Sequence, residues 1–170
     1  MRKLLTLAVP VVAAGAAHAG TLEISVEIPK LTVSEYHRPY IAIWIEDASG
    51  KVAANLNVWY ATKLDNDEGE KWLKDIRQWW RRTGRGLDLP IDGVSSPTKP
   101  PGKNVVKFDT SSGPIASLAP GDYKIIVEAS REVGGKELVE LPFKWAPGAD
   151  ATGSASGKEE LGAISFKLTK

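Results

Sequence analysis

The sequence contains no cysteine, and its single methionine is the first residue. The absence of cysteine excludes disulfides, thiolate zinc sites, iron–sulfur clusters and cysteine nucleophiles. The chain also lacks an excess of either charge, because 22 basic residues stand against 21 acidic ones. Proteins that bind nucleic acid usually carry a clear basic surplus, so we predict no nucleic-acid partner.

The first nineteen residues have the three parts of a secretory signal peptide. Arg2 and Lys3 form a positive end, residues 4–16 form an apolar run, and a small-residue pattern that ends at Ala19 fits signal peptidases. We therefore predict cleavage after Ala19 and a periplasmic mature protein. Because that region has no cysteine, a lipid anchor at the new N-terminus is excluded.

The mature chain, residues 20–170, has the length of a single domain, and no segment of it reaches the 18 or so apolar residues that a membrane helix needs. We predict one domain and no membrane insertion. Cleavage removes His18, so His37 is the only histidine left. A histidine-based triad or a histidine-rich metal site then has little to build on, and we predict no catalytic residues and no metal site.

Most of the mature chain alternates apolar and polar residues in short runs separated by turn residues, which is typical of β-strands. A tract of small residues at about 147–157 predicts a flexible loop. The runs predict a mainly β protein with the fold of an immunoglobulin-like antiparallel β-sandwich. The predicted strands lie at about residues 21–28, 40–46, 52–60, 104–108, 121–130, 138–145 and 164–168.

One segment follows the period of an α-helix instead. Trp72, Ile76, Trp79 and Trp80 recur at helical spacing, and charged residues occupy the positions between them. The pattern predicts one amphipathic α-helix over about 67–82, inserted midway in the sandwich. We expect Trp72 and Ile76 to be among its most buried residues.

A glycine- and proline-rich segment, residues 84–102, follows this helix. It is long for a connection without structure, which favours a functional edge of the molecule. Around the end of the helix, Arg81, Arg82 and Arg85 can donate hydrogen bonds to an anionic group on a partner, and Trp80 offers a flat apolar surface. These four residues are the predicted partner-binding site, although a solvated helix end is the simpler alternative.

The six tryptophans suggest a further hypothesis, because an indole face can stack on a sugar ring. Trp59 and Trp80 are the two that we expect to be most exposed. They would serve a carbohydrate-binding module, and the alternative is that all six pack in the core.

Several short motifs follow one another in a distinctive order. They are Tyr40–Lys51, Lys71–Leu73, Trp79–Arg81, Pro100–Gly102 and Pro120–Tyr123. Across about residues 22–145 the order of these motifs is similar to that of the predicted periplasmic domain-of-unknown-function family 2271 (DUF2271). A Pro-Gly turn before a tyrosine-containing strand, within residues 101–129, also resembles the immunoglobulin-like repeat of flagellar hook-capping proteins, which implies a sandwich.

The DUF2271 resemblance implies a redox setting. Members of that family often lie beside periplasmic flavin transferases and PepSY-type membrane proteins, and many carry a segment Asp-x-x-Ser/Thr-Gly-Ala-Thr that is similar to the acceptor motif for covalent FMN attachment to its last residue. Here Asp92, Ser95 and Thr98 match that segment, which would make them the cofactor-binding residues. Ser96 and Pro97 replace the glycine and the alanine, and Pro97 restricts both positions to fewer conformations.

The sequence therefore supports two main classes of function. The first is an exported, non-catalytic binding or accessory module of an envelope system that handles redox chemistry or iron, without a cofactor of its own. Its partner would be an envelope protein, with a flavin transferase or a PepSY-type membrane protein as candidates. The alternative is a flavin-carrying electron-transfer protein with FMN linked to Thr98, and a carbohydrate-binding module ranks below both.

Overall fold

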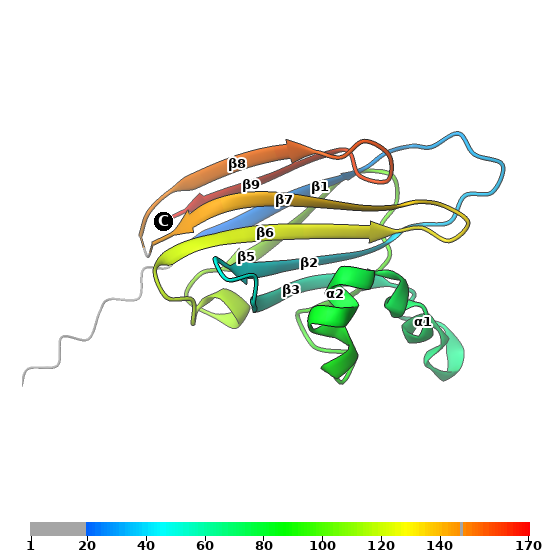
Figure 1. The fold of residues 1–170 in the computed structure, drawn as a ribbon, viewed down its shortest axis with the longest axis horizontal. Helices are drawn as coiled ribbons and strands as arrows, with labels where there is room; N and C mark the ends of the chain where they lie inside the picture. Colours follow the sequence, from blue (N-terminus) through cyan, green and yellow to red (C-terminus); the bar gives the residue numbers. More distant parts are fainter. Residues whose placement is uncertain (1–19, 147) are drawn as a thin grey trace, which may run out of the picture.

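The computed structural model describes residues 20–146 and 148–170, so the predicted signal peptide lies outside the described residues (Figure 1). The strands form two sheets, a four-stranded sheet in the order β5-β1-β9-β8 and a five-stranded sheet in the order β4-β3-β2-β6-β7. The predicted mainly β sandwich is confirmed. The strands are β1 (Thr21–Ile28), β2 (Tyr40–Asp47), β3 (Val52–Tyr60), β4 (Ser95–Pro97), β5 (Gly102–Asp109), β6 (Gly121–Ser130), β7 (Lys136–Trp145), β8 (Ala151–Ser156) and β9 (Ala163–Thr169).

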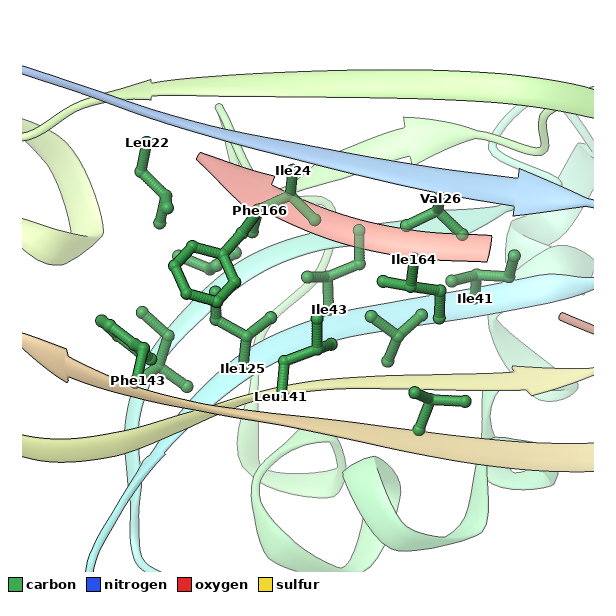
Figure 2. Close-up of a cluster of buried hydrophobic side chains, with 14 of the residues drawn as sticks. Leu22, Ile24, Val26, Ile41, Ile43, Ile125, Leu141, Phe143, Ile164 and Phe166 are labelled. Carbon is green, nitrogen blue, oxygen red and sulfur yellow. The ribbon is translucent and has the colours of Figure 1, made fainter. Parts of the chain in front are cut away.

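Aliphatic side chains, together with Phe143 and Phe166, fill the space between the two sheets (Figure 2). Because side chains alternate between the two faces of a strand, every second residue of β1 and of β9 points into this inner core. Ile24 of β1, Ile43 of β2 and Ile164 of β9 are all fully buried there. Burial of this continuous apolar layer is the main force that holds the two sheets together.

The five-stranded sheet is buried on both faces along β2 and part of β3 and β6. In β2, Ile41 and Ile43 face the inner core, whereas Ala42 and Trp44 face the other way and are also fully buried. The outward-facing side chains belong to a second apolar cluster, which we call the outer cluster. It consists of Ala42, Trp44, Val58, Tyr60, Leu73, Ile76, Trp79, Val94 and Ile126.

A helical layer covers this outer face, but the single α-helix predicted over 67–82 is wrong (Figure 1). Asn66 and Asp67 have positive φ angles of 54° and 55°, and Ile76 has a non-helical ψ of 78°. The segment is therefore divided into short helices. They are η1 (Asp65–Asp67), α1 (Glu68–Lys71), η2 (Leu73–Asp75), α2 (Arg77–Arg82) and η3 (Gly84–Gly86), and a further short helix, η4 (Gly113–Ile115), follows β5.

The break changes which tryptophan is buried. Leu73, Ile76 and Trp79 are fully buried and lie three residues apart, so the apolar stripe has a spacing of three rather than four. Trp72 consequently faces outward and is 50% exposed. The expectation for Ile76 is confirmed, and the expectation that Trp72 is a core residue is wrong.

The tract at 147–157, predicted as a flexible loop, instead contains β8, and this expectation is wrong. Strand β8 pairs with β9 at the edge of the four-stranded sheet and contacts β7 of the facing sheet. Its small residues have a packing role, because a Cβ on Gly153 would lie 2.4 Å from a ring carbon of Phe166. The contact between β7 and β8 closes one side of the sandwich.

Candidate functional site

The segment 84–102, predicted as the functional edge, packs against the five-stranded sheet rather than looping away from it. Leu87, Leu89 and Ile91 pack against the outer cluster. Gly93, with a φ of 75°, provides the left-handed turn that leads into β4. Strand β4 then pairs with β3 in parallel, so this segment forms the outer edge of the sheet.

A pocket of about 340 Å³ opens beside this edge. Residues of β3, the 93–99 segment, β5 and the 112–114 turn surround it. We call it the edge pocket and define it by its polar residues, which are Asn57, Ser96, Lys99, Lys107, Asp109 and Ser112. Gly93, Ser96 and Lys99 come from the predicted segment, so that segment supplies part of the pocket wall.

Buried groups fix the wall of the edge pocket. Trp59 is fully buried, and its indole N–H donates to the side-chain oxygen of Asn57, itself 6% exposed. The Asn57 amide lies 3.5 Å from the carbonyl oxygen of Gly93, which is a long contact for a hydrogen bond. Lys99 extends over the Trp59 ring, with its ammonium 5.8 Å from the ring centre, in a cation–π contact.

The charges of the pocket differ in how they are paired. Lys107 forms an ion pair with Glu23 at 3.0 Å. The side chain and backbone N–H of Ser111 both donate to Asp109 and hold the pKa of its carboxyl below the usual value. Lys99 has no acidic partner among residues 20–146 and 148–170. Lys99 is therefore the cation of this pocket that can receive an anionic group.

The structure places the three residues of the flavin-like motif along one short segment. Asp92 is exposed in the turn before β4. Ser95 has a structural role, because its hydroxyl oxygen accepts the backbone N–H of Ile91 at 3.0 Å. Thr98 follows β4, is half-buried, and donates its backbone N–H to Tyr60 at 3.1 Å. The three side chains thus share an edge without forming a common cluster.

The four residues of the predicted partner site are not equivalent. A guanidinium nitrogen of Arg82 lies 2.8 Å from the buried carboxylate of Glu46 and also donates to the carbonyl oxygen of Gly50. Arg81 donates to Gln78 at 3.0 Å, and Arg85 is exposed. Trp80 is half-buried against the outer cluster. Arg82 therefore belongs to the packing of α2 on the sheet, and Arg81 and Arg85 are the more accessible cations.

The tryptophan pair predicted for sugar stacking is not available on the surface. Trp59 lies in the inner core with no exposed surface, and Trp80 is only partly exposed. The expectation that both are exposed is wrong for Trp59, because β3 is covered on both faces. The exposed tryptophan is Trp72, which the helical period had assigned to the core.

A second pocket, of about 240 Å³, has no signal in the sequence patterns used above. It lies where the segment before β2, the helix η2 and the β6–β7 turn meet, at the right-hand end of Figure 1. We call it the end pocket, and its residues include Arg38, Tyr40, Trp72, Arg131, Val133 and Lys136. A spacing of three residues for the apolar stripe would have turned Trp72 outward and pointed to this region.

Two other kinds of site are missing from the described ranges. These ranges contain no group of three or more His, Cys, Asp or Glu side chains placed to hold a metal ion. They also contain no helix that is long and apolar enough to cross a membrane.

The sandwich with its helical cover defines the class, a mainly β protein. Comparison with known families identifies the family within that class. A family model for DUF2271, described as a predicted periplasmic protein, matches residues 21–163. The chain belongs to this family, as the motif order predicted. Neither the curated proteins nor the solved structures contained a match. The family description supports an exported, periplasmic module.

Proposed function

We propose that the mature chain is a non-catalytic binding module of an envelope redox system, and that the edge pocket receives an acidic group of an envelope protein partner. The observation that carries the proposal is the position of Lys99, a cation without an acidic partner in the described chain, at the wall of a pocket of about 340 Å³. A carboxylate placed there would gain a charge-assisted hydrogen bond in a partly desolvated site.

Two features support binding rather than catalysis. The walls of the edge pocket are held by buried groups, Trp59 and Asn57, so the pocket is preorganised and its own ordering costs little free energy on docking. His37 does not line the pocket, and its ring lies between Glu35 at 2.8 Å and Glu132 at 3.3 Å. The pocket thus combines a fixed shape with one available cation and no histidine base.

A pull-down from an envelope fraction tests this proposal. We expect Lys99→Gln to reduce recovery of the partner about tenfold, which corresponds to loss of a single charge-assisted contact of about 1.4 kcal/mol. Lys144→Gln is the matched control, because Lys144 is an exposed lysine of β7 that does not line the pocket. A folded Lys99→Gln protein that recovers every partner as well as the wild type would contradict the proposal.

The alternative function is a flavin carrier with FMN joined to Thr98 through a phosphoester. One observation favours it: Thr98 is only half-buried beside the edge strand β4, and its hydroxyl makes no hydrogen bond within the described part of the chain. Intact-mass measurement after co-expression with a flavin transferase distinguishes the two functions. An added FMN mass that disappears in Thr98→Ala supports the flavin carrier, and an unmodified chain supports the binding module.

A further inference from the structure

The two sides of the sandwich are closed in different ways. On one side, the edge strands β7 and β8 contact each other across the two sheets. On the other side, the edge strands are β4 and β5, and the edge pocket lies between Ser96 of β4 and residues 106–109 of β5. This second side is therefore open, and a further segment of chain can enter it.

Three of the four sheet edges are poorly suited to pairing with another strand. Strand β4 has only three residues and ends at Pro97, β7 contains Pro142, and β8 contacts β7 of the facing sheet. Proline lacks a backbone N–H, and short or covered strands offer few groups to pair with. Strand β5 has eight residues without a proline and pairs with β1 in an unbroken register. It is thus the edge that can accept a further strand.

The backbone of β5 has unused hydrogen-bonding groups on its free side. The N–H of Thr110, one residue beyond β5, donates to the carbonyl oxygen of Gly20 at 2.9 Å. In an antiparallel pair every second residue bonds to the same neighbour, so residues 104, 106 and 108 also bond to β1. Lys103, Val105 and Lys107 direct their N–H groups away from β1, where the described residues provide no partner.

The inner core is incompletely covered along the same strand. Val106 and Phe108 pack against the inner core but stay partly exposed, and both line the edge pocket. Their register partners on β1, Ile24 and Leu22, are buried. Apolar side chains of an added strand would cover Val106 and Phe108 and so bury further apolar area.

The charges along this edge favour an acidic strand. Lys99 and Lys103 have no carboxylate within ion-pair distance among the described residues. The carboxylates near this edge already accept an ion pair or hydrogen bonds from the protein itself. They belong to Glu23, Glu27 and Asp109. Strand β5 of a second copy carries two lysines against one aspartate, so it matches this edge less well than an acidic segment does.

We infer that an extended acidic segment of the partner adds to the free edge of β5 as an antiparallel strand, with acidic side chains at Lys99 and Lys103 and apolar side chains over Val106 and Phe108. The inference rests on the proposed function, because this segment carries the acidic group that enters the edge pocket. Main-chain hydrogen bonds to β5 would provide affinity, and the acidic and apolar side chains would provide specificity.

Titration of the mature protein with a synthetic peptide tests the inference. The probe is Glu-Val-Glu-Glu-Glu-Val-Glu-Val, which has the length of β5, and the control peptide has lysine in place of every glutamate. We expect the acidic peptide to bind at least tenfold more tightly than the control. It should also protect the amides of Lys103, Val105 and Lys107 from hydrogen exchange. Binding without this protection, or no binding at millimolar concentration, would overturn the inference.

A proline in β5 tests the main-chain contacts directly. Val105→Pro removes one outward N–H and keeps the groups that pair with β1, so it should fold. We expect it to weaken the acidic peptide at least tenfold, whereas Val105→Ala, which keeps the N–H, is the control and should change binding less than twofold. A folded Val105→Pro protein that binds as the wild type does would overturn the inference. If Val105→Pro does not fold, the exchange protection in the wild type decides.

Lys99→Gln separates this inference from the proposed function. Weaker binding in Lys99→Gln but not in Val105→Pro would retain the acidic contact and overturn the added strand. Weaker binding in Val105→Pro but not in Lys99→Gln would retain the strand and contradict the proposed role of Lys99. A dimer of the mature protein that dissociates in Val105→Pro would assign this edge to a second copy and overturn the inference.

Discussion

The two faces of the five-stranded sheet are held by different forces. The inner face packs mostly aliphatic side chains against the other sheet, and its cohesion comes from burial of apolar area, which has no preferred direction (Figure 2). The outer face carries tryptophan and tyrosine side chains under a layer of short helices. Helices of three to six residues have little stability of their own, so this cover depends on specific contacts with the sheet.

Buried carboxylates of the sheet provide those contacts. Glu128 of β6 is 5% exposed, and it accepts the backbone N–H groups of Gln78 at 3.0 Å and Trp79 at 2.8 Å, where α2 begins. These N–H groups have no partner within the helix, so the carboxylate satisfies them. Glu46 of β2 in turn holds Arg82 at the end of α2. The comparison shows that one sheet can use apolar area on one face and directional bonds on the other.

The largest loss of stability is expected where apolar burial and a directional hydrogen bond act on the same side chain. Trp79 is fully buried in the outer cluster, and its indole N–H donates to Asn55 at 2.9 Å. Trp79→Ala should lower the free energy of unfolding by about 3–5 kcal/mol, measured by urea denaturation. Ile43→Ala in the inner core is the reference, with an expected loss of about 2–5 kcal/mol. A loss below about 1 kcal/mol for Trp79→Ala would mean that the outer layer is not coupled to the sheet.

The directional contacts can be weakened without changing shape. Glu128→Gln keeps the size of the side chain but removes its charge and one acceptor oxygen, so we expect a loss of about 1–3 kcal/mol. Hydrogen exchange should become faster at the amides of Gln78 and Trp79 while the amides of β1 keep their protection. Glu140→Gln, at an exposed position of β7, is the control. Equal acceleration in α2 and in β1 would show that the helical cover does not open separately from the sheets.

A third effect depends on pH. Burial acts to raise the pKa of Glu137, but the backbone N–H groups of residues 158–161 donate to its carboxylate and hold the pKa below its usual value of 4.5. The stability that this gives is present above pH 4.5 and is lost as the pH falls through the lower pKa of the folded state. The free energy of unfolding should therefore fall more steeply below pH 4.5 in the wild type than in Glu137→Gln. Parallel curves would exclude this contribution.

The smallest loss of stability is expected at Trp72, which directly precedes the buried Leu73 at the start of η2. Because Trp72 is 50% exposed, Trp72→Ala should change the free energy of unfolding by no more than about 0.5 kcal/mol. Thermal denaturation beside Trp79→Ala provides the comparison. A loss of several kcal/mol would return Trp72 to the core.

The strands were predictable from the sequence because apolar and polar residues alternate along a strand that is buried on one face only. The bounds predicted at 21–28 and 121–130 agree with β1 and β6. The prediction of a single helix failed because apolar residues recur at both three- and four-residue spacings, and the sequence does not specify which of them face the sheet. The contact with Glu128, which local sequence does not reveal, decides where α2 begins. The loop prediction for 147–157 failed because a run of small residues indicates a loop, and the packing of Gly153 against Phe166 is visible only in the structure.

The candidate sites were predictable to a smaller extent. The segment 84–102 was predicted as the functional edge, and it contributes Lys99 to a pocket, although nothing in the sequence singles Lys99 out. The partner of Arg82 is Glu46, which lies 36 residues earlier and is brought beside it only by tertiary packing. The end pocket joins residues as distant as Arg38 and Arg131, so no local pattern could reveal it.

The register of β1 has a consequence for how this chain folds. Strand β1 pairs with β5 on one side and with β9 on the other, so Thr21 lies opposite Thr169 at the far end of the sequence. Contacts between residues so distant in the chain form late and slowly, because a large loop must close first. The four-stranded sheet cannot be completed until the last strand is available. The five-stranded sheet contains neither β1 nor β9, so it can form before the four-stranded sheet is complete.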